Sequence, residues 1–153
     1  MCGAFNRVVD ELPDLMRRLR LEPARPWGEW TDVPKRGVYL LLEDDRPVYI
    51  GRSDNILRRL RQHGNAKSPQ NQASLAFNLA KRDALARGDR IAAGKRDDVQ
   101  HDPAFKPLFE RAKERIRRMS FQAVEIADPV TQTLFEVYAH MELGTELNDF
   151  RNH

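Results

Sequence analysis

The chain has 153 residues, of which 41% are hydrophobic and 32% charged, a balance typical of a soluble globular protein with one core. Its single cysteine, Cys2, excludes a disulfide framework and a cysteine-rich zinc site and favours a reducing compartment. No apolar run approaches the length of a membrane span, and the first residues mix acids with bases. We therefore expect a cytoplasmic protein with no membrane partner and one domain over residues 1–153.

The net charge of +3 does not by itself argue for nucleic acid, but its distribution is uneven. Residues 52–63 hold four arginines against one aspartate, and residues 81–118 hold twelve basic against seven acidic side chains. Residues 119–153 hold six acids and one arginine. This pattern is compatible with a phosphate-binding surface beside a metal-binding carboxylate. An unspecialised surface with uneven charge explains it equally well.

Residues 1–36 are predicted to form an N-terminal helix and an irregular segment. Apolar side chains recur at helical spacing over residues 5–20, and the helix either starts or bends at Pro13. The remainder combines prolines with Trp27 and Trp30, and we expect it to pack over the core.

Residues 37–42 and 47–51 are β-prone runs that predict an antiparallel hairpin. In an antiparallel pair without a bulge, the residue numbers of directly opposite residues always add up to the same sum. Tyr39 and Tyr49 can share a face only if this sum is even, because side chains alternate between the two faces. The loop should then contain an odd number of residues, most simply 44–46, unless a bulge intervenes. An unbulged loop of two or four residues would place the tyrosines on opposite faces.

A basic helix is predicted to follow the hairpin. Ser53 or Asp54 can cap it, and the apolar pattern continues to about His63. Asn55, Arg59 and His63 recur every four residues, so they lie along one stripe of the helix.

Residues 64–119 are predicted to be a helical insertion. Its first helix starts at Ser68, residues 87–101 form a mobile loop, and its second helix starts at Asp102. The second helix has an apolar stripe formed by Phe105, Leu108, Phe109, Ala112, Ile116 and Met119. A basic line on another face consists of Arg111, Arg115 and Arg118. An amide-rich cluster, which either contacts sugar and phosphate or serves loops and helix caps, consists of Asn65, Gln70, Asn71, Gln72 and Asn78.

Residues 120–126 are predicted to form a third strand, and Asp128 to cap a final helix. The tail from 144 to 153 is expected to be a loop that is ordered only if something holds it. The expected inward side of the final helix consists of Val130, Leu134, Tyr138 and Met141.

Gly37-Val38-Tyr39 and Tyr49-Ile50-Gly51, followed by the basic helix, resemble the GIY-YIG nuclease superfamily. Valine at position 38 replaces the usual isoleucine, and the nine residues between the tyrosines are slightly fewer than is common. The resemblance covers residues 37–63 closely and 120–150 more loosely. It implies an α+β fold with a small three-stranded antiparallel sheet flanked by helices, with two extra helices inserted between strands 2 and 3 in this chain.

The resemblance also implies catalytic residues. Glu136 matches the family's metal ligand and would hold one Mg²⁺ or Mn²⁺, and Asn148 matches the asparagine after that helix. Tyr39 is the expected general base. Tyr49 would orient water or phosphate, and Arg59 would bind the scissile phosphate. His63 would relay a proton, and Asn55 matches the polar residue at the start of the helix.

A metal-dependent endonuclease that hydrolyses DNA with low sequence specificity is the implied function. RNA is not excluded as substrate, and a homo-oligomer or a recruiting protein partner is compatible with the chain. Expected nucleic-acid contacts are Arg52, Asn55, Arg58, Arg61, Arg111, Arg115 and Arg118.

Each candidate also has a structural interpretation. Tyrosines are common in strands, an arginine on a helix is usually solvated, and Glu136 could be an ordinary exposed helix residue. His63 could be a surface histidine favoured by a helix C-terminus. At the level of the chain, the alternatives are a nucleic-acid-binding module that keeps the fold without cleaving, and a protein–protein adaptor with an exposed apolar patch.

Overall fold

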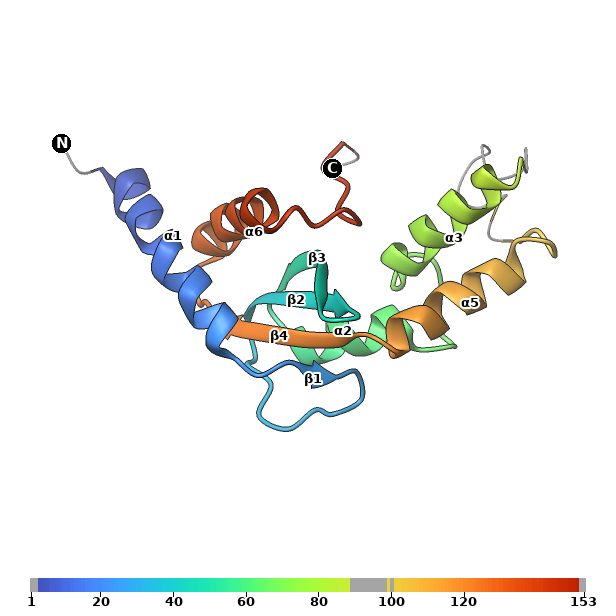
Figure 1. Ribbon diagram of the computed structural model, residues 1–153, viewed down its shortest axis with the longest axis horizontal. Helices are drawn as coiled ribbons and strands as arrows, with labels where there is room; N and C mark the ends of the chain where they lie inside the picture. The colour runs from blue at the N-terminus through green and yellow to red at the C-terminus, as the bar shows by residue number, and fades with distance from the viewer. Residues whose placement is uncertain (1–2, 89–98, 100, 152–153) are drawn as a thin grey trace. The chain divides into compact units, whose positions relative to one another are not determined.

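The computed structural model describes residues 3–88, 99 and 101–151 (Figure 1). The chain packs as two compact units, Met1–Arg58 with Met119–His153 and Arg59–Arg118. The predicted α+β class is confirmed, with five described helices and an antiparallel sheet. None of the helices in the described part of the chain combines the length and apolarity that crossing a membrane requires.

The sheet of the first unit has four strands, one more than predicted. The strands are β1 (Arg25–Pro26), β2 (Gly37–Glu43), β3 (Arg46–Ser53) and β4 (Ser120–Glu125), in the order β1-β4-β2-β3 with every pair antiparallel. The missed strand, β1, has only two residues and contains a proline, so it carries no alternating pattern. It pairs Arg25 with Phe121 of β4. The predicted third strand over 120–126 corresponds to β4.

The β2–β3 hairpin closes with a two-residue turn, so the prediction of a three-residue loop over 44–46 is wrong. Glu43 pairs directly with Arg46. Asp44 and Asp45 both have positive φ, 52° and 62°, the sign combination of a type I′ turn. Aspartate tolerates this left-handed region better than most residues because its short side chain bonds locally.

A bulge next to the turn restores the expected register of the tyrosines. Leu41 pairs with Tyr49, whereas Leu42 pairs with Pro47, which leaves Val48 as an extra residue on β3. The pairing sum therefore changes from odd at the turn to even further along. Tyr39 and Tyr49 consequently point to the same face of the sheet, as predicted.

Helices α1 (Ala4–Leu21) and α6 (Pro129–Leu143) cover the other face. Pro13 lies inside α1, so the alternative in which this helix starts there is wrong. The shared core consists of Leu12, Leu15, Met16, Leu19, Val38, Leu40, Leu42, Ile50, Val124, Ile126, Phe135 and Ala139. The β2 residues in this core, Val38, Leu40 and Leu42, are even-numbered. Because side chains alternate along a strand, Tyr39 points to the opposite face of the sheet and is not part of this core.

The predicted inner side of α6 is only partly right, because Leu134 and Tyr138 pack against the core whereas Val130 and Met141 do not. Val130 and Met141 are 61% and 76% exposed, and the buried residues are Thr131, Gln132, Phe135 and Ala139. The predicted cap is confirmed, because the Asp128 carboxylate accepts hydrogen bonds from the backbone N–H and the hydroxyl of Thr131. Counting apolar residues fails here because two buried positions are polar and find hydrogen-bond partners.

The irregular segment packs over the sheet, as predicted. Trp30 lies 5.6 Å from Phe121 between ring centroids, and Trp27 meets Trp30 edge-on at 5.2 Å. Phe121 pairs with Leu41 of β2, an odd-numbered position, so it belongs to the face that carries the tyrosines.

Helix α2 (Ile56–Gly64) runs from the first unit into the second, which also contains α3 (Ser74–Ala86) and α5 (Lys106–Arg117). The cap of α2 is Asn55, whose side-chain oxygen accepts from the Arg58 N–H, and not Ser53 or Asp54. Helices α3 and α5 begin later than predicted, because Pro69 and Asp102 first form hydrogen-bonded turns.

An aromatic cluster joins α3 to α5. Phe77 of α3 lies 5.2 Å from Phe105 and 6.1 Å from Phe109 between ring centroids. The predicted apolar stripe of α5 is buried throughout. The expected mobile loop over residues 87–101 falls mostly outside the described residues.

Candidate active site

Two tyrosines lie side by side on the face of the sheet that α1 and α6 do not cover. Tyr39 is 1% exposed and Tyr49 is half-buried, with 6.3 Å between their ring centroids. Tyr39 pairs with Gly51 and Tyr49 with Leu41, so the two phenols come from neighbouring strands. The two rings are therefore neighbours on one face of the sheet.

The motif glycines provide the space for this arrangement. A Cβ on Gly51 would lie 2.5 Å from both Cζ and Oη of Tyr39, so the tyrosine ring crosses the backbone where a side chain would otherwise be. Gly37 has φ +148°, and a Cβ there would lie 2.0 Å from the carbonyl oxygen of Val124. Glycine at both positions therefore follows from close approach to neighbouring atoms.

Helix α6 carries a polar stripe of three residues at successive turns: Gln132, Glu136 and His140. Buried Gln132 donates to the carbonyl oxygen of Ile126 at 2.7 Å and accepts a long 3.4 Å contact from Nη1 of Arg52. Glu136 is half-buried, and α6 packs against β3 and β2. Sequence analysis missed Gln132 because an isolated glutamine carries no motif.

The C-terminal tail is held by β3, which is an edge strand of the sheet. The Ile50 N–H donates to Oδ1 of Asn148 at 2.9 Å, and Nδ2 of Asn148 donates to the Ile50 carbonyl at 2.8 Å. The Leu147 N–H donates to the Val48 carbonyl at 2.9 Å. The amide of Asn148 thus replaces a neighbouring strand at Ile50, the residue between Tyr49 and Gly51.

His140 also helps to fix the tail. Its Nδ1 lies 2.8 Å from the hydroxyl of buried Thr145, and its ring centroid lies 4.8 Å from that of Phe150. The tail leaves α6 through Gly144, which has the left-handed φ of 64° that ends many helices. Contacts of this kind order the segment that the sequence predicts as a loop.

Replacing Asn148 by alanine is expected to free the edge of β3 and to lower the free energy of unfolding by about 1–3 kcal/mol, because both bonds to Ile50 are lost. Amide hydrogen exchange should report faster exchange of the Ile50 N–H. Asn148→Asp retains the acceptor but sets a carboxylate oxygen against the Ile50 carbonyl, so it should not restore wild-type stability. Unchanged exchange at Ile50 in Asn148→Ala would contradict the strand-like role of this amide.

Glu136 is the expected metal ligand. Within the described ranges no group of three or more His, Cys, Asp or Glu side chains could hold a metal ion. A single carboxylate such as Glu136 suits a Mg²⁺ or Mn²⁺ ion whose coordination is completed by water and substrate phosphate oxygens. It does not fit a zinc site, which takes several protein ligands.

In the second unit, the guanidinium of Arg59 is already engaged. Nη1 donates to the Gln72 carbonyl at 2.8 Å, and Nη2 donates to the Ser74 hydroxyl at 3.1 Å. A guanidinium has five N–H donors, so these two bonds orient the side chain while other donors are available for a phosphate.

His63 is fully buried, which excludes the surface interpretation of this residue. Burial and, secondarily, the positive charge of Arg59 lower its pKa from 6.5 to about 3. The imidazole is therefore neutral at pH 7 and a weak base while no anion is bound. A phosphate at Arg59 would offset only the secondary cause of this low pKa, the charge of Arg59.

This low pKa predicts a stability loss in mild acid. Below pH 6.5 the unfolded chain takes up a proton at His63 that the folded chain does not take up until about pH 3. The free energy of unfolding should therefore fall by about 1.4 kcal/mol per pH unit over this window. Urea unfolding at pH 7 and pH 5 measures the loss. His63→Leu should lose less stability between these pH values, and an equal loss in both proteins would contradict the assignment.

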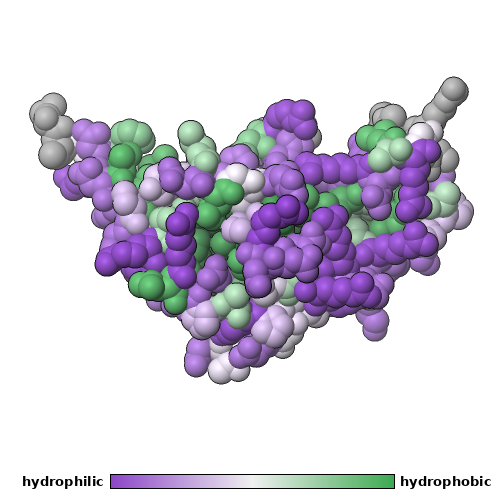
Figure 2. Space-filling model, viewed as in Figure 1, coloured by the Kyte–Doolittle hydropathy of each residue, from purple (hydrophilic) through white to green (hydrophobic). Residues whose placement is uncertain are grey.

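The expected nucleic-acid contacts are mostly exposed. Exposed side chains belong to Arg52, Arg58, Arg61, Arg111, Arg115 and Arg118. Arg118 also donates to the Glu114 carboxylate at 2.9 Å, and Asn55 is used as the cap of α2. Hydrophilic residues dominate the surface over α5 in Figure 2.

Phenols, a guanidinium, an imidazole and a carboxylate are groups that phosphodiester cleavage uses. Residues 35–86 match the family model described as the GIY-YIG catalytic domain, and this match supports membership of the GIY-YIG nuclease superfamily. The matched region contains Tyr39, Tyr49, Arg59 and His63 and does not reach Glu136. No curated protein and no solved structure matches the chain.

Proposed function

We propose that the chain is a metal-dependent endonuclease that hydrolyses DNA phosphodiester bonds with low sequence specificity. The paired phenols of Tyr39 and Tyr49, within a region that matches a catalytic-domain family, carry this proposal. Tyr39 is buried, and its ring lies where a side chain at position 51 would be, which fixes the position of its hydroxyl. This arrangement supports a chemical role for the Tyr39 hydroxyl.

Tyr39 is the proposed general base for the attacking water. A free phenol has a pKa of about 10, so a nearby cation must favour its ionised form at neutral pH. Tyr49 orients the water or the phosphate. Asn148 acts through the backbone, because it fixes Ile50 next to Tyr49.

The second requirement of the reaction is stabilisation of the negative charge on the phosphate. Arg59 is proposed to bind the scissile phosphate, and neutral His63 to accept a proton once a bound anion has raised its pKa. Glu136 would hold Mg²⁺ or Mn²⁺, which supplies charge neutralisation and polarises the phosphoryl group.

A non-cleaving nucleic-acid-binding module is the alternative. The chain has all six of the residues that the chemistry uses, and a module without activity does not need them together. Exposed arginines without a recognisable base-reading motif support low sequence specificity and a strong salt dependence.

The test uses end-labelled duplex DNA, single-stranded DNA and RNA of one sequence, each incubated with Mg²⁺ and with a chelator. We expect internal cleavage of DNA only with Mg²⁺. Binding without cleavage of any substrate would favour the alternative, and cleavage of RNA alone would change the substrate class.

A further inference from the structure

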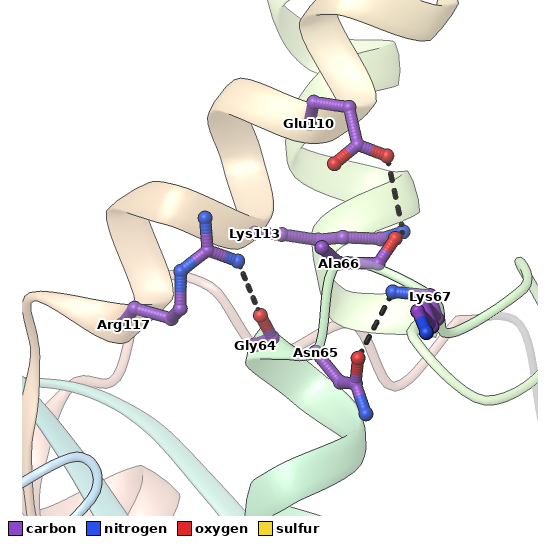
Figure 3. A network of polar contacts seen from close by, with 7 residues as sticks. All are labelled: Gly64, Asn65, Ala66, Lys67, Glu110, Lys113 and Arg117. Carbon is purple, nitrogen blue, oxygen red and sulfur yellow. Dashed lines mark hydrogen bonds and ion pairs between the residues drawn. The ribbon is translucent and has the colours of Figure 1, made fainter.

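Three cationic side chains of the second unit bind backbone carbonyls at the end of α2 and in the loop between α2 and α3. Arg117 donates to the Gly64 carbonyl, Lys113 donates to the Ala66 carbonyl at 2.8 Å, and Arg59 donates to the Gln72 carbonyl at 2.8 Å. Figure 3 shows the first two of these anchors, both from α5. We refer to residues 65–72 as the anchored loop.

Lys113 is the least expected of these anchors. Its side chain is only 2% exposed, beside the apolar stripe of α5. Burial of an ammonium group is costly unless it is compensated. Here the Ala66 carbonyl, the Glu110 carboxylate at 3.4 Å and the Phe109 ring, whose centroid is 4.1 Å from Nζ, provide that compensation.

Ordinary capping of α2 explains only part of this arrangement. Basic side chains often bind the last carbonyls of a helix, and Gly64 is the last residue of α2. Ala66 and Gln72 lie beyond the helix end, so their carbonyls belong to the loop itself. Lys113 and Arg59 therefore hold the loop itself, near its start at Ala66 and at its end at Gln72.

The anchored loop displays polar side chains on its outer side. Asn65, Lys67, Asn71 and Gln72 are all exposed. Oδ1 of Asn65 accepts from the Lys67 N–H at 2.9 Å, which further fixes the loop (Figure 3). Amide and ammonium groups donate hydrogen bonds to phosphate and sugar oxygens. A loop that is already rigid loses little conformational entropy when it binds.

We propose that the anchored loop is a contact surface for the sugar–phosphate backbone of a nucleic acid, with Lys67, Asn71 and Gln72 as donors and Lys113 as a positioning residue. The inference rests on the proposed function, because it assigns a surface for that substrate.

The test measures binding of fluorescently labelled duplex DNA in the presence of a chelator, so that cleavage does not enter. Lys67→Ala should weaken binding about tenfold and lower the slope of log affinity against log salt by about 1. Asn71→Ala with Gln72→Ala should weaken binding about fivefold with the slope unchanged, and equally for A·T-rich and G·C-rich duplexes.

Lys113→Met tests the anchoring itself, since a buried side chain cannot touch DNA. It should weaken binding more than Lys106→Met, a variant with the same charge change at an exposed position of α5. Equal affinities of these two variants would overturn the positioning role. The loop variants change exposed residues, so they keep the proposal testable if Lys113→Met does not fold.

Wild-type affinity in both loop variants, or a loss confined to one base composition, would overturn the backbone contact. If the protein cleaves DNA while the loop variants bind normally, the inference fails and the proposed function stands. If the wild-type protein neither binds nor cleaves nucleic acid, the proposed function fails and this inference fails with it.

Discussion

Tyr39→Phe is expected to lower the rate of DNA cleavage by at least about a hundredfold, the usual contribution of a positioned general base. The substitution removes one oxygen and keeps the ring that fills the space beside Gly51. Folding should therefore be retained, which circular dichroism and thermal unfolding can verify. Cleavage is measured in single-turnover conditions with Mg²⁺.

Tyr138→Phe is the matched control for this experiment. Tyr138 lies on α6, partly buried against the core, with its ring centroid 6.3 Å from that of Phe135. The same atom is removed from a tyrosine outside the proposed site, so cleavage should continue at nearly the wild-type rate. A wild-type rate in Tyr39→Phe would show that the hydroxyl of Tyr39 takes no part in the chemistry.

Gly51→Ala is expected to damage both stability and activity. The new methyl group would lie 2.5 Å from Cζ and Oη of Tyr39, closer than carbon atoms in proteins approach one another. Either the ring or the strand must move, and such overpacking costs about 1–3 kcal/mol. Because the displaced atom is the proposed base, cleavage should fall as far as in Tyr39→Phe.

Urea unfolding and the cleavage assay together test this prediction. Gly3→Ala is a suitable control, because a Cβ at Gly3 would meet no atom within 4 Å. That variant should retain cleavage and change stability by less than about 1 kcal/mol. If Gly51→Ala cleaves and unfolds like the wild type, the close approach of Tyr39 to Gly51 is not a constraint on the site.

The hairpin shows both the strength and the limit of prediction from sequence. The family resemblance required Tyr39 and Tyr49 on one face, which the pairing confirms, and the parity of residue numbers converted this requirement into a loop length. Parity could not decide between an odd loop and an even loop with a bulge, since both satisfy the same sum. The turn at Asp44 and Asp45 with an extra Val48 is selected by backbone geometry that the pattern of residue types does not record.

Regular amphipathic patterns predicted the elements whose buried side is apolar. The stripe of α5 is an example. The cap of α6 at Asp128 was predicted separately, from the residue type that precedes the helix. The amphipathic pattern misplaced part of the inner side of α6, where Gln132 is buried and bonded to Ile126. It also gave no sign that Lys113 is buried.

For the candidate site, the motif identified positions and the structure adds their physical constraints. Sequence analysis marked Asn148 as part of the motif, but only the structure shows its paired hydrogen bonds to Ile50. The burial of His63 was equally invisible, since a histidine near a helix end is commonly at the surface. Long-range packing decides both features.

Cleavage of supercoiled plasmid by wild-type protein and by Glu136→Gln, each with Mg²⁺, is the most direct test of a metal-dependent nuclease. Glutamine preserves the size of the side chain and removes the charge that would hold the cation. We predict nicking by the wild type, loss of nicking on addition of a chelator, and no nicking by Glu136→Gln at any Mg²⁺ concentration. Nicking by Glu136→Gln at the wild-type rate, or by the wild type in chelator, would contradict the account.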